Sequence, residues 1–430
     1  FRSSDVGGGP RVAVKSDGAS SEKKSTSKVS SGQAKTTVAK GSDKTKAPTK
    51  PAKGTKDKPA PKAPPPKVPD PEQINQLADL LQETWAINRP LIIGGRGAMN
   101  GGAGPALRRL GELTGALMAT SLPANGLFYD DPFNVGVCGT YSNPVASELI
   151  PQADCVLAFG AALNIMTTYN NTMFPKAMLV HVDHAPAKFG VFMDPELTLE
   201  ADVKLTAEAL VAELERRGHQ TQGFRTDETR ATIAAFDKAE GIKDKTTDTL
   251  IDPRTMLLTI DKMLPRDRVF CADGGHFVRH SVRYMEVTGP RNFVQANENA
   301  SIGLGIGLGL GAAVGRPDAV VMVSVGDTAM MMSLGDIESA VRLKLNILIV
   351  IGNDEALGAE VMVLNRHNMD TSVAQLASPS FEKIGAAMGA WAATVRKVSD
   401  LDIVEKWVKE RPGLPLVLDV RVNPEVRAAA

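Results

Sequence analysis

The feature that most constrains the fold is a pair of short apolar runs that both end in a glycine followed by polar residues. The first run, Ala319–Val325, ends in Gly326-Asp327, and the second, Ile347–Ile351, ends in Gly-Asn-Asp at 352–354. One helix-like segment, DIESAVRL, lies between them. This arrangement predicts two neighbouring parallel strands joined by a right-handed helical crossover.

The same alternation of short apolar runs and amphipathic segments continues along most of the chain. Further strand-like runs are LII, ALMAT, CVLAF, MLVHV, RVFCA and LVLDV. Runs this short are typical of the buried strands of a parallel sheet, and the segments between them have the apolar period of helices. We therefore predict an α/β protein with two doubly wound parallel-sheet domains, at 71–220 and 251–430, joined by a polar connector at 221–250.

Four local patterns give specific expectations. Asp70 and Pro71 predict the start of a helix with an apolar stripe that begins at Ile74. The segment GGRGAMNGG predicts a glycine-rich turn, and FEKIGAAMGAW predicts a single helix. Gly303–Gly311 alternates Gly with Leu or Ile, which fits either a strand or a tightly packed helix. Glycine costs helix stability, so the second option requires a close neighbour.

Residues 1–70 differ in composition from the rest of the chain. They hold 16 Lys and Arg but only six Asp and Glu, a net charge of +10, whereas the whole chain is neutral. Lysine alternates with Ala, Pro, Ser and Thr, so this segment cannot bury a core and predicts a disordered linker. It has no aromatic residue after Phe1, which argues against specific nucleic-acid recognition.

The remaining composition indicates a cytoplasmic protein. No apolar run reaches 18 residues without interruption, and the N-terminus lacks an apolar signal-peptide core, so we predict neither a membrane span nor secretion. Cys138, Cys155 and Cys271 have no Cys-x-x-Cys spacing, as is typical of reduced thiols. The sequence begins with Phe rather than Met, and we expect it to be part of a longer protein.

The polar residues after the two apolar runs predict a metal site. The carboxyl ends of parallel strands meet at one edge of a sheet, where ligands bind. Asp327 and Asp354 should therefore lie about 5 Å apart, the spacing of adjacent strands. Carboxylates suit Mg²⁺, and the loop after Gly326 offers N–H groups to a phosphate. The pair predicts a Mg²⁺–diphosphate site, and the alternative is that each Asp is a turn or capping residue.

Gly326–Asp354 resembles a known signature, that of thiamine-diphosphate enzymes, which begins Gly-Asp-Gly and ends Asn-Asn. Asp354 follows Asp327 by the 27 residues that separate the equivalent signature residues, and Asp336 matches an acidic residue nine positions after the first Asp. Three further segments resemble parts of the same family's central domain: PDPEQINQLADLL, RPLIIGGRGA and HVDHAPAKFG. Both predicted domains thus resemble the acetolactate synthase, benzoylformate decarboxylase and pyruvate decarboxylase family.

The resemblance implies two sets of site residues. It implies Mg²⁺ bound by the carboxylates of Asp327 and Asp354 and by the backbone carbonyl of Ala356. It implies thiamine diphosphate held by Gly275, His276, Ala300, Ile302, Gly326, Thr328 and Ala329. In this assignment the N–H groups of Thr328 and Ala329 bind the diphosphate. Ile302 wedges the cofactor into its bent form, and the carbonyl of Ala300 accepts from the aminopyrimidine.

The chain departs from the family pattern at four places, one of which is His184 in place of the second Asp of the central-domain segment. Thr328 stands where the signature has its second Gly, and Asp354 stands where it has Asn, which adds a negative charge beside the diphosphate. LNIMTTYNNTMFP replaces an Arg-rich stretch of the flavin-using members, so the resemblance does not predict bound FAD.

The resemblance implies an enzyme of acetolactate-synthase type, a thiamine-diphosphate-dependent synthase or lyase. Its C2 carbanion attacks a 2-oxo acid, CO₂ leaves, and the remaining fragment passes to an acceptor. A benzoylformate-type decarboxylase or a hydroxyacyl-CoA lyase is the alternative. The substrate pocket would be lined partly by Leu357, Glu360, Val361 and Leu364.

In this family the activating Glu lies in an N-terminal pyrimidine-binding domain and reaches the cofactor of another subunit. Residues 1–70 do not resemble that domain, so we expect the chain to depend on a part it lacks, and a homodimer or homotetramer follows from the shared site. A non-catalytic or regulatory subunit stays an alternative. A dinucleotide-binding oxidoreductase does too, because GGRGAMNGG suggests it, although G-x-G-x-x-G is absent.

Overall fold

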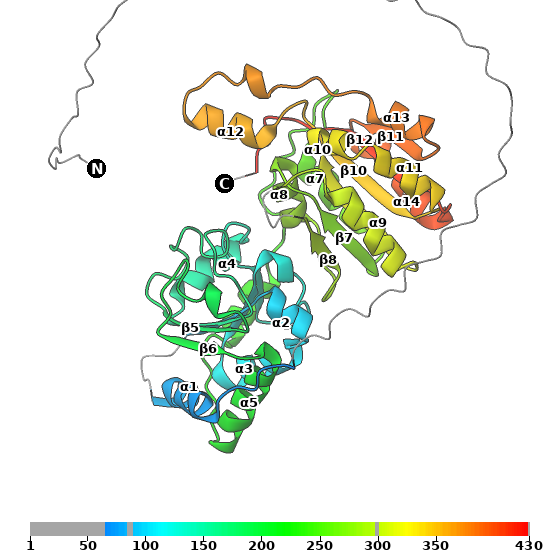
Figure 1. The fold of residues 1–430 in the computed structure, drawn as a ribbon. Helices are drawn as coiled ribbons and strands as arrows, with labels where there is room; N and C mark the ends of the chain where they lie inside the picture. The colour runs from blue at the N-terminus through cyan, green and yellow to red at the C-terminus, as the bar shows by residue number, and fades with distance from the viewer. Residues whose placement is uncertain (1–64, 84–88, 297–300, 429–430) are drawn as a thin grey trace, which may run out of the picture. The chain divides into compact units, whose positions relative to one another are not determined.

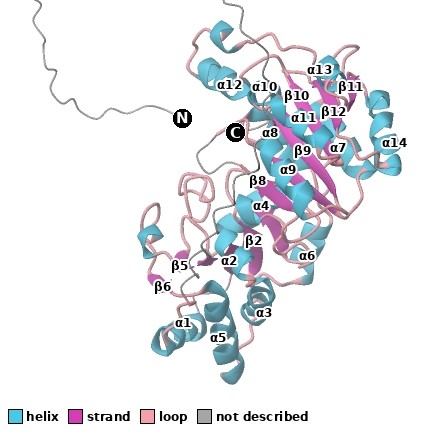
Figure 2. Ribbon diagram, turned by 45° about the vertical axis from the view of Figure 1, so that its right-hand side comes forward, coloured by secondary structure: helices cyan, strands magenta, loops and turns pink. Residues whose placement is uncertain are grey.

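The computed structural model describes residues 65–83, 89–296 and 301–428, which form two parallel sheets with helices on both faces (Figure 1, Figure 2). Every strand pairing within the two sheets is parallel. The predicted α/β class with two doubly wound sheets is therefore confirmed. The predicted linker lies outside the described residues as far as residue 64.

The first sheet has the strand order β3-β2-β1-β4-β5-β6. Its strands are β1 (Pro90–Gly94), β2 (Leu117–Thr120), β3 (Asn134–Val137), β4 (Cys155–Phe159), β5 (Met178–Asp183) and β6 (Leu197–Glu200). One face is covered by α1 (Pro71–Glu83), α3 (Gly104–Thr114) and α5 (Val203–Arg216), and the other by α4 (Pro144–Leu149). Successive side chains of β1 point to opposite faces of the sheet. Ile92 packs on the face covered by α1, α3 and α5, and Leu91 packs on the face covered by α4.

The second sheet has the strand order β11-β12-β10-β9-β7-β8. Its strands are β7 (Arg268–Ala272), β8 (Phe293–Gln295), β9 (Val320–Gly326), β10 (Ile347–Asn353), β11 (Trp391–Val395) and β12 (Leu416–Arg421). One face packs against α7 (Pro253–Met263), α8 (His276–Tyr284) and α14 (Asp402–Glu410). The other packs against α9 (Gly305–Gly315), α10 (Asp327–Met332), α11 (Gly335–Arg342) and α13 (Phe381–Ala387). A further helix, α12 (Gly358–Arg366), follows β10.

Four strands were not predicted, and all four lie at the edges of the sheets: β3, β6, β8 and β11. Their residues alternate between buried and half-exposed or are mostly half-exposed, whereas β1, β4 and β7 are buried throughout. An edge strand has less surface to bury and so lacks a continuous apolar run. The predicted helix FEKIGAAMGAW is wrong at its end, because α13 stops at Ala387 and Trp391 begins β11.

The structure confirms one of the other local predictions and corrects two. The N–H of Glu72 donates to the Asp70 carboxylate at 2.9 Å, so the predicted helix start is confirmed. The glycine-rich turn is wrong in part, because it contains the short helix α2 (Arg96–Gly101). The connector 221–250 contains α6 (Asp227–Ala234), which begins at a Thr226 cap that was not recognised.

Gly303–Gly311 proves to be mainly helical, as part of α9. A Cβ on Gly309 would lie 2.4 Å from a methyl of Val323, and one on Gly305 would lie 2.8 Å from the Cβ of Asp273. These two glycines therefore let the helix lie close to β9 and to the end of β7. Gly307 has nothing within 4 Å of its Cβ position, so a close neighbour accounts for only some of the glycines.

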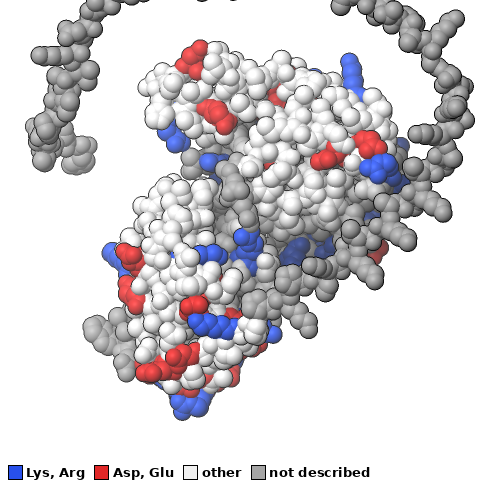
Figure 3. All heavy atoms as spheres, in the orientation of Figure 1, with Lys and Arg blue, Asp and Glu red and all other residues white. Residues whose placement is uncertain are grey.

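The outer surface of α9 and α10 is apolar. Leu304, Val314, Met331 and Met332 are all exposed, and Figure 3 shows few charged side chains over this face of the second sheet. Of the three consecutive methionines, only Met330 is buried in the core. Among the described residues, no helix is long and apolar enough to cross a membrane.

Candidate functional site

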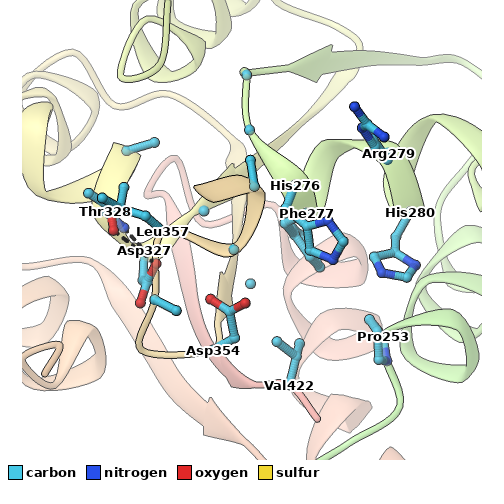
Figure 4. Close-up of a pocket in the computed structure, with 18 of the residues that line it drawn as sticks. Pro253, His276, Phe277, Arg279, His280, Asp327, Thr328, Asp354, Leu357 and Val422 are labelled. Carbon is cyan, nitrogen blue, oxygen red and sulfur yellow. Dashed lines mark hydrogen bonds between the residues drawn. The ribbon is translucent and has the colours of Figure 1, made fainter. Parts of the chain in front are cut away.

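A cavity of about 330 Å³ opens at the carboxyl ends of β7, β9 and β10 (Figure 4). The chain order of the second sheet reverses between β7 and β9, and ligands of open α/β sheets bind at such a switch point. Nine of the ten residues assigned from the sequence line this cavity: Gly275, His276, Ile302, Gly326, Asp327, Thr328, Ala329, Asp354 and Ala356. The tenth, Ala300, lies outside the described residues.

Asp327 is the first residue of α10 and is almost completely buried. Its position follows from the register, because Gly326 pairs with Gly352 and so places Asp327 beside the end of β10. One carboxylate oxygen accepts from the Thr328 N–H at 2.7 Å, and the other accepts from the Ser378 hydroxyl at 2.6 Å. Burial raises the pKa of Asp327, and these hydrogen bonds only partly oppose the rise.

Asp354 follows the last residue of β10, and its carboxylate faces the same part of the cavity as that of Asp327 (Figure 4). A Cβ on Gly358 would meet Asp354 Oδ2 at 2.9 Å and His276 Cβ at 3.2 Å, so these three residues are in close contact. Burial, and then the charge of Asp327, raise the pKa of Asp354 to about 7. The two carboxylates therefore repel each other in a desolvated site.

The turn after β10 brings Ala356 to the cavity wall. Glu355 has a left-handed backbone with φ of +55°, which is rare for a residue other than glycine. Ala356 forms an isolated antiparallel bridge with Gln375, and the N–H of Leu376 donates to the Glu355 carbonyl at 2.8 Å. The segment that contains α12 thus leaves the site at Ala356 and returns beside it.

The start of α8 forms the opposite wall. Gly275 has φ of +88° and caps the helix, and His276 begins it. Burial and the nearby Arg279 and Arg427 lower the pKa of His276 to about 4, and its Nδ1 is buried without a hydrogen-bond partner. The structure therefore presents a neutral imidazole to the cavity.

His280 lies one turn further along α8, lines the same cavity, and was not recognised in the sequence. Its ring centroid is 5.4 Å from that of His276. Burial and His276 lower its pKa to about 3. The backbone of Val426 interacts favourably with the ring, yet neither ring nitrogen makes a hydrogen bond of normal geometry. The spacing of four residues between the two histidines was the signal that could have revealed it.

Asp273 is a buried carboxylate at the site that sequence reasoning also missed. It directly follows β7 and accepts the N–H groups of Gly274 and Gly303 at 2.7 and 3.0 Å. It thereby fixes the entry to α9 next to Ile302, which is half-buried in the cavity wall. Its role is to position backbone, because its oxygens are occupied by these donors.

The predicted substrate-pocket residues are divided. Leu357 and Glu360 line the main cavity, and Val361 lines a neighbouring cavity that shares His276 and Asp354. Leu364 lies further along α12 and is in neither lining.

The donor set of the main cavity fits a hard divalent cation. The buried carboxylate of Asp327, the half-buried carboxylate of Asp354 and a backbone carbonyl are oxygen ligands, and Mg²⁺ takes one or two carboxylates together with phosphate oxygens and water. A cation would also relieve the repulsion that raises the pKa of Asp354. Among the described residues, no three His, Cys, Asp or Glu side chains form a metal cluster, so further ligands would come from backbone, cofactor or water.

Two N–H groups of the glycine-rich segment of the first sheet already donate to backbone carbonyls and so do not face a dinucleotide phosphate. The N–H of Gly95 donates to the Phe159 carbonyl at 2.8 Å, and that of Gly97 donates to the Gly160 carbonyl at 3.0 Å. Both bonds close the space between the ends of β1 and β4, which is the switch point of that sheet. The hydrogen bonding here does not favour the oxidoreductase alternative.

The fold and the cavity define a two-domain α/β protein with an acidic ligand site at the strand ends of its second sheet. Comparison with known families is more specific. Residues 74–210 match the thiamine pyrophosphate enzyme central domain, and residues 273–420 match the thiamine pyrophosphate enzyme C-terminal TPP-binding domain. The chain belongs to the thiamine pyrophosphate enzyme family, of which it contains these two domains.

Similar proteins are acetolactate synthases. Acetolactate synthase 2, chloroplastic, of Nicotiana tabacum is 26% identical over 369 residues, which is 83% of this chain and 54% of the relative. The probable acetolactate synthase large subunit of Methanocaldococcus jannaschii is 26% identical over 366 residues, 82% of this chain and 60% of the relative. The chain spans about half the length of the curated relatives it matches.

Proposed function

We propose that this chain acts as a thiamine-diphosphate-dependent synthase or lyase of acetolactate-synthase type, with a 2-oxo acid as substrate. The observation that carries the proposal is the pair Asp327 and Asp354, two desolvated carboxylates in one cavity of the matched TPP-binding domain. A bound cation would offset the repulsion between these two carboxylates and so lower the free energy of the site, whereas it would bring no such benefit to an uncharged cavity.

In this proposal Asp327 and Asp354 would bind Mg²⁺ through their carboxylates, and Ala356 would bind it through its carbonyl. Ser378 donates to one oxygen of Asp327, so that side chain is held in place before the metal binds. The diphosphate of the cofactor and water would supply the remaining oxygen ligands of Mg²⁺.

Residues at the starts of α8 and α10 would hold the cofactor. The first N–H groups of α10 have no carbonyl one turn back inside the helix, so those of Thr328 and Ala329 face the diphosphate. The Thr328 N–H already donates to Asp327 and would be shared. Gly275 and His276 approach from the opposite wall, Gly326 gives room for the diphosphate, and Ile302 supports the bent cofactor. Ala300 is proposed as the acceptor for the aminopyrimidine.

Thiamine diphosphate supplies a thiazolium carbon that attacks a 2-oxo group and stores the electron pair left when CO₂ departs. The chain's own residues bind and orient the cofactor, and Leu357 and Glu360 border the space where the substrate would enter. His276, neutral at pH 7, can donate or accept a hydrogen bond without adding charge.

We also propose that the chain assembles as a homodimer or homotetramer, acts in the cytoplasm, and completes its active site with a pyrimidine-binding domain. The apolar surface of α9 and α10 supports an assembly, because exposed apolar patches commonly mark protein interfaces.

The test is product analysis with pyruvate, Mg²⁺ and thiamine diphosphate, using the full chain alone and mixed with the pyrimidine-binding domain of a relative. Acetolactate as the product supports the synthase. Acetaldehyde alone supports the decarboxylase alternative. Cofactor binding without turnover of pyruvate or other 2-oxo acids in either preparation contradicts the enzyme and supports a non-catalytic subunit.

A further inference from the structure

The turn from Asn353 to Ala356 carries two of the three proposed metal ligands. Glu355, between the ligands, holds a left-handed backbone that a side chain disfavours. Such a conformation persists only where the surroundings fix it. The question is which residues outside the cavity do so.

The first anchor is Asp419, a buried residue of β12, the strand beside β10. Its Oδ1 accepts from the Asn353 side-chain amide at 2.8 Å, and its Oδ2 accepts from the N–H of Phe381 at 3.1 Å. These contacts fix the orientation of the Asn353 amide, whose oxygen is then free to accept the N–H of Glu355 at 3.3 Å. Asp419 thus acts on the turn through one side chain.

The second anchor is Arg421, two residues further along β12. It pairs in register with Asn353, and its guanidinium forms an ion pair with the carboxylate of Glu355. Arg421 is mostly buried, so this ion pair is shielded from solvent on one side. The Asn353 side chain therefore fixes the backbone of Glu355, and Arg421 fixes the side chain of Glu355.

We propose that Asp419 and Arg421 are positioning residues that hold the Asn353–Ala356 turn in the form that presents Asp354 and the Ala356 carbonyl to the cation. The inference rests on the proposed function, because it gives these residues a role only if a metal binds at the turn. Asp419 and Arg421 themselves are in neither cavity lining. Their effect is indirect, as expected of groups that orient metal ligands.

The experiment measures Mn²⁺ affinity of the full chain with thiamine diphosphate, from the electron paramagnetic resonance signal of free Mn²⁺. The variants are Asp419→Asn, Arg421→Met, Glu355→Gln and the double variant Arg421→Met/Glu355→Gln. We expect Asp419→Asn to raise the Kd about tenfold, the lower end of the effect of removing outer groups that orient metal ligands, because Asp419 acts through Asn353. Each single change at the ion pair should raise it about threefold, and the double variant should equal either single one.

The matched control is Glu382→Gln, which removes a carboxylate that accepts from the Thr394 hydroxyl at 2.6 Å in the same domain, away from the cavity. It should leave the Mn²⁺ Kd unchanged. If Asp419→Asn does not fold, judged by circular dichroism, the ion-pair cycle decides alone.

The outcomes separate two failures. If the wild-type chain binds Mn²⁺ but the Asp419 and Arg421 variants bind it equally well, or if Glu382→Gln weakens binding as much, the positioning role is refuted. Additive effects of Arg421→Met and Glu355→Gln would refute the ion-pair part. If the wild-type chain binds no Mn²⁺ with thiamine diphosphate, the proposed function fails, and this inference fails with it.

Discussion

Replacing Asp354 with Asn tests whether the ionised Asp354 carboxylate destabilises the metal-free chain. Burial and the neighbouring Asp327 raise the pKa of Asp354 from 3.8 to about 7. The folded chain therefore binds this proton more tightly than the unfolded chain. Stability is lost as pH rises from the unfolded pKa through the folded one, and above both values the full cost is present.

The magnitude follows from the shift. A difference of about three pKa units corresponds to roughly 4 kcal/mol. Asp354 keeps some exposure to solvent, which reduces the effect, so we expect the metal-free Asp354→Asn chain to be more stable than wild type by about 2 kcal/mol at pH 8. At pH 4 the two chains should be equally stable, because the carboxyl is then protonated in the folded state.

The assay is urea unfolding with EDTA from pH 4 to pH 8.5, followed by tryptophan fluorescence. Two of the three tryptophans, Trp391 and Trp407, lie in the second domain and report on it. Glu410→Gln, an exposed change at the end of α14, is the charge control and should have little effect. A gain for Asp354→Asn that is absent at pH 8, or is equally large at pH 4, would refute the reasoning.

Two further predictions concern packing and protonation. Gly352→Ala should destabilise the chain by about 1–3 kcal/mol in urea unfolding, because its Cβ would lie 2.3 Å from the Phe277 ring. Gly307→Ala, whose Cβ meets nothing within 4 Å in α9, should stabilise it by about 0.5–1 kcal/mol, and equal effects would contradict the packing described. His276 and His280, with pKa values of about 4 and 3, should stay neutral above pH 5.5 in the folded chain. Because their ordinary pKa is 6.5, their contribution to the stability of the fold is fully present above about that pH and is lost as the pH falls below it. Nuclear magnetic resonance titration checks this, and ring signals of these two residues that titrate near pH 6.5 would show that they are not desolvated.

The central strands of both sheets could be predicted from the sequence, and the edge strands could not. β9 and β10 are buried on both faces and appear as almost continuous apolar runs, broken in β9 by Ser324. β11 has mostly half-exposed residues, so Trp391 looked like the end of a helix rather than the start of a strand. The difference lies in how much of each strand the fold buries, which no local pattern encodes.

The same limit applies to the site. Asp327 and Asp354 could be placed together because the ends of adjacent parallel strands meet. The contacts that hold the turn after β10 could not be predicted. Asp419 lies on β12, and its hydrogen bond with Asn353 spans 66 residues of sequence. Ser378 likewise reaches Asp327 from beyond the α12 segment, over 51 residues. Long-range side-chain contacts of this kind depend on the completed sheet.

The central claim is that the second domain holds a Mg²⁺–diphosphate cofactor through Asp327. The most direct measurement is calorimetric titration of the full chain with thiamine diphosphate, in Mg²⁺ and in EDTA, for wild type, Asp327→Asn and the control Glu338→Gln, an exposed change on α11. We predict saturable binding that requires Mg²⁺, is weakened at least about tenfold by Asp327→Asn and is unchanged by Glu338→Gln. Binding that is equally strong in EDTA, or equally strong without the Asp327 carboxylate, would contradict the claim.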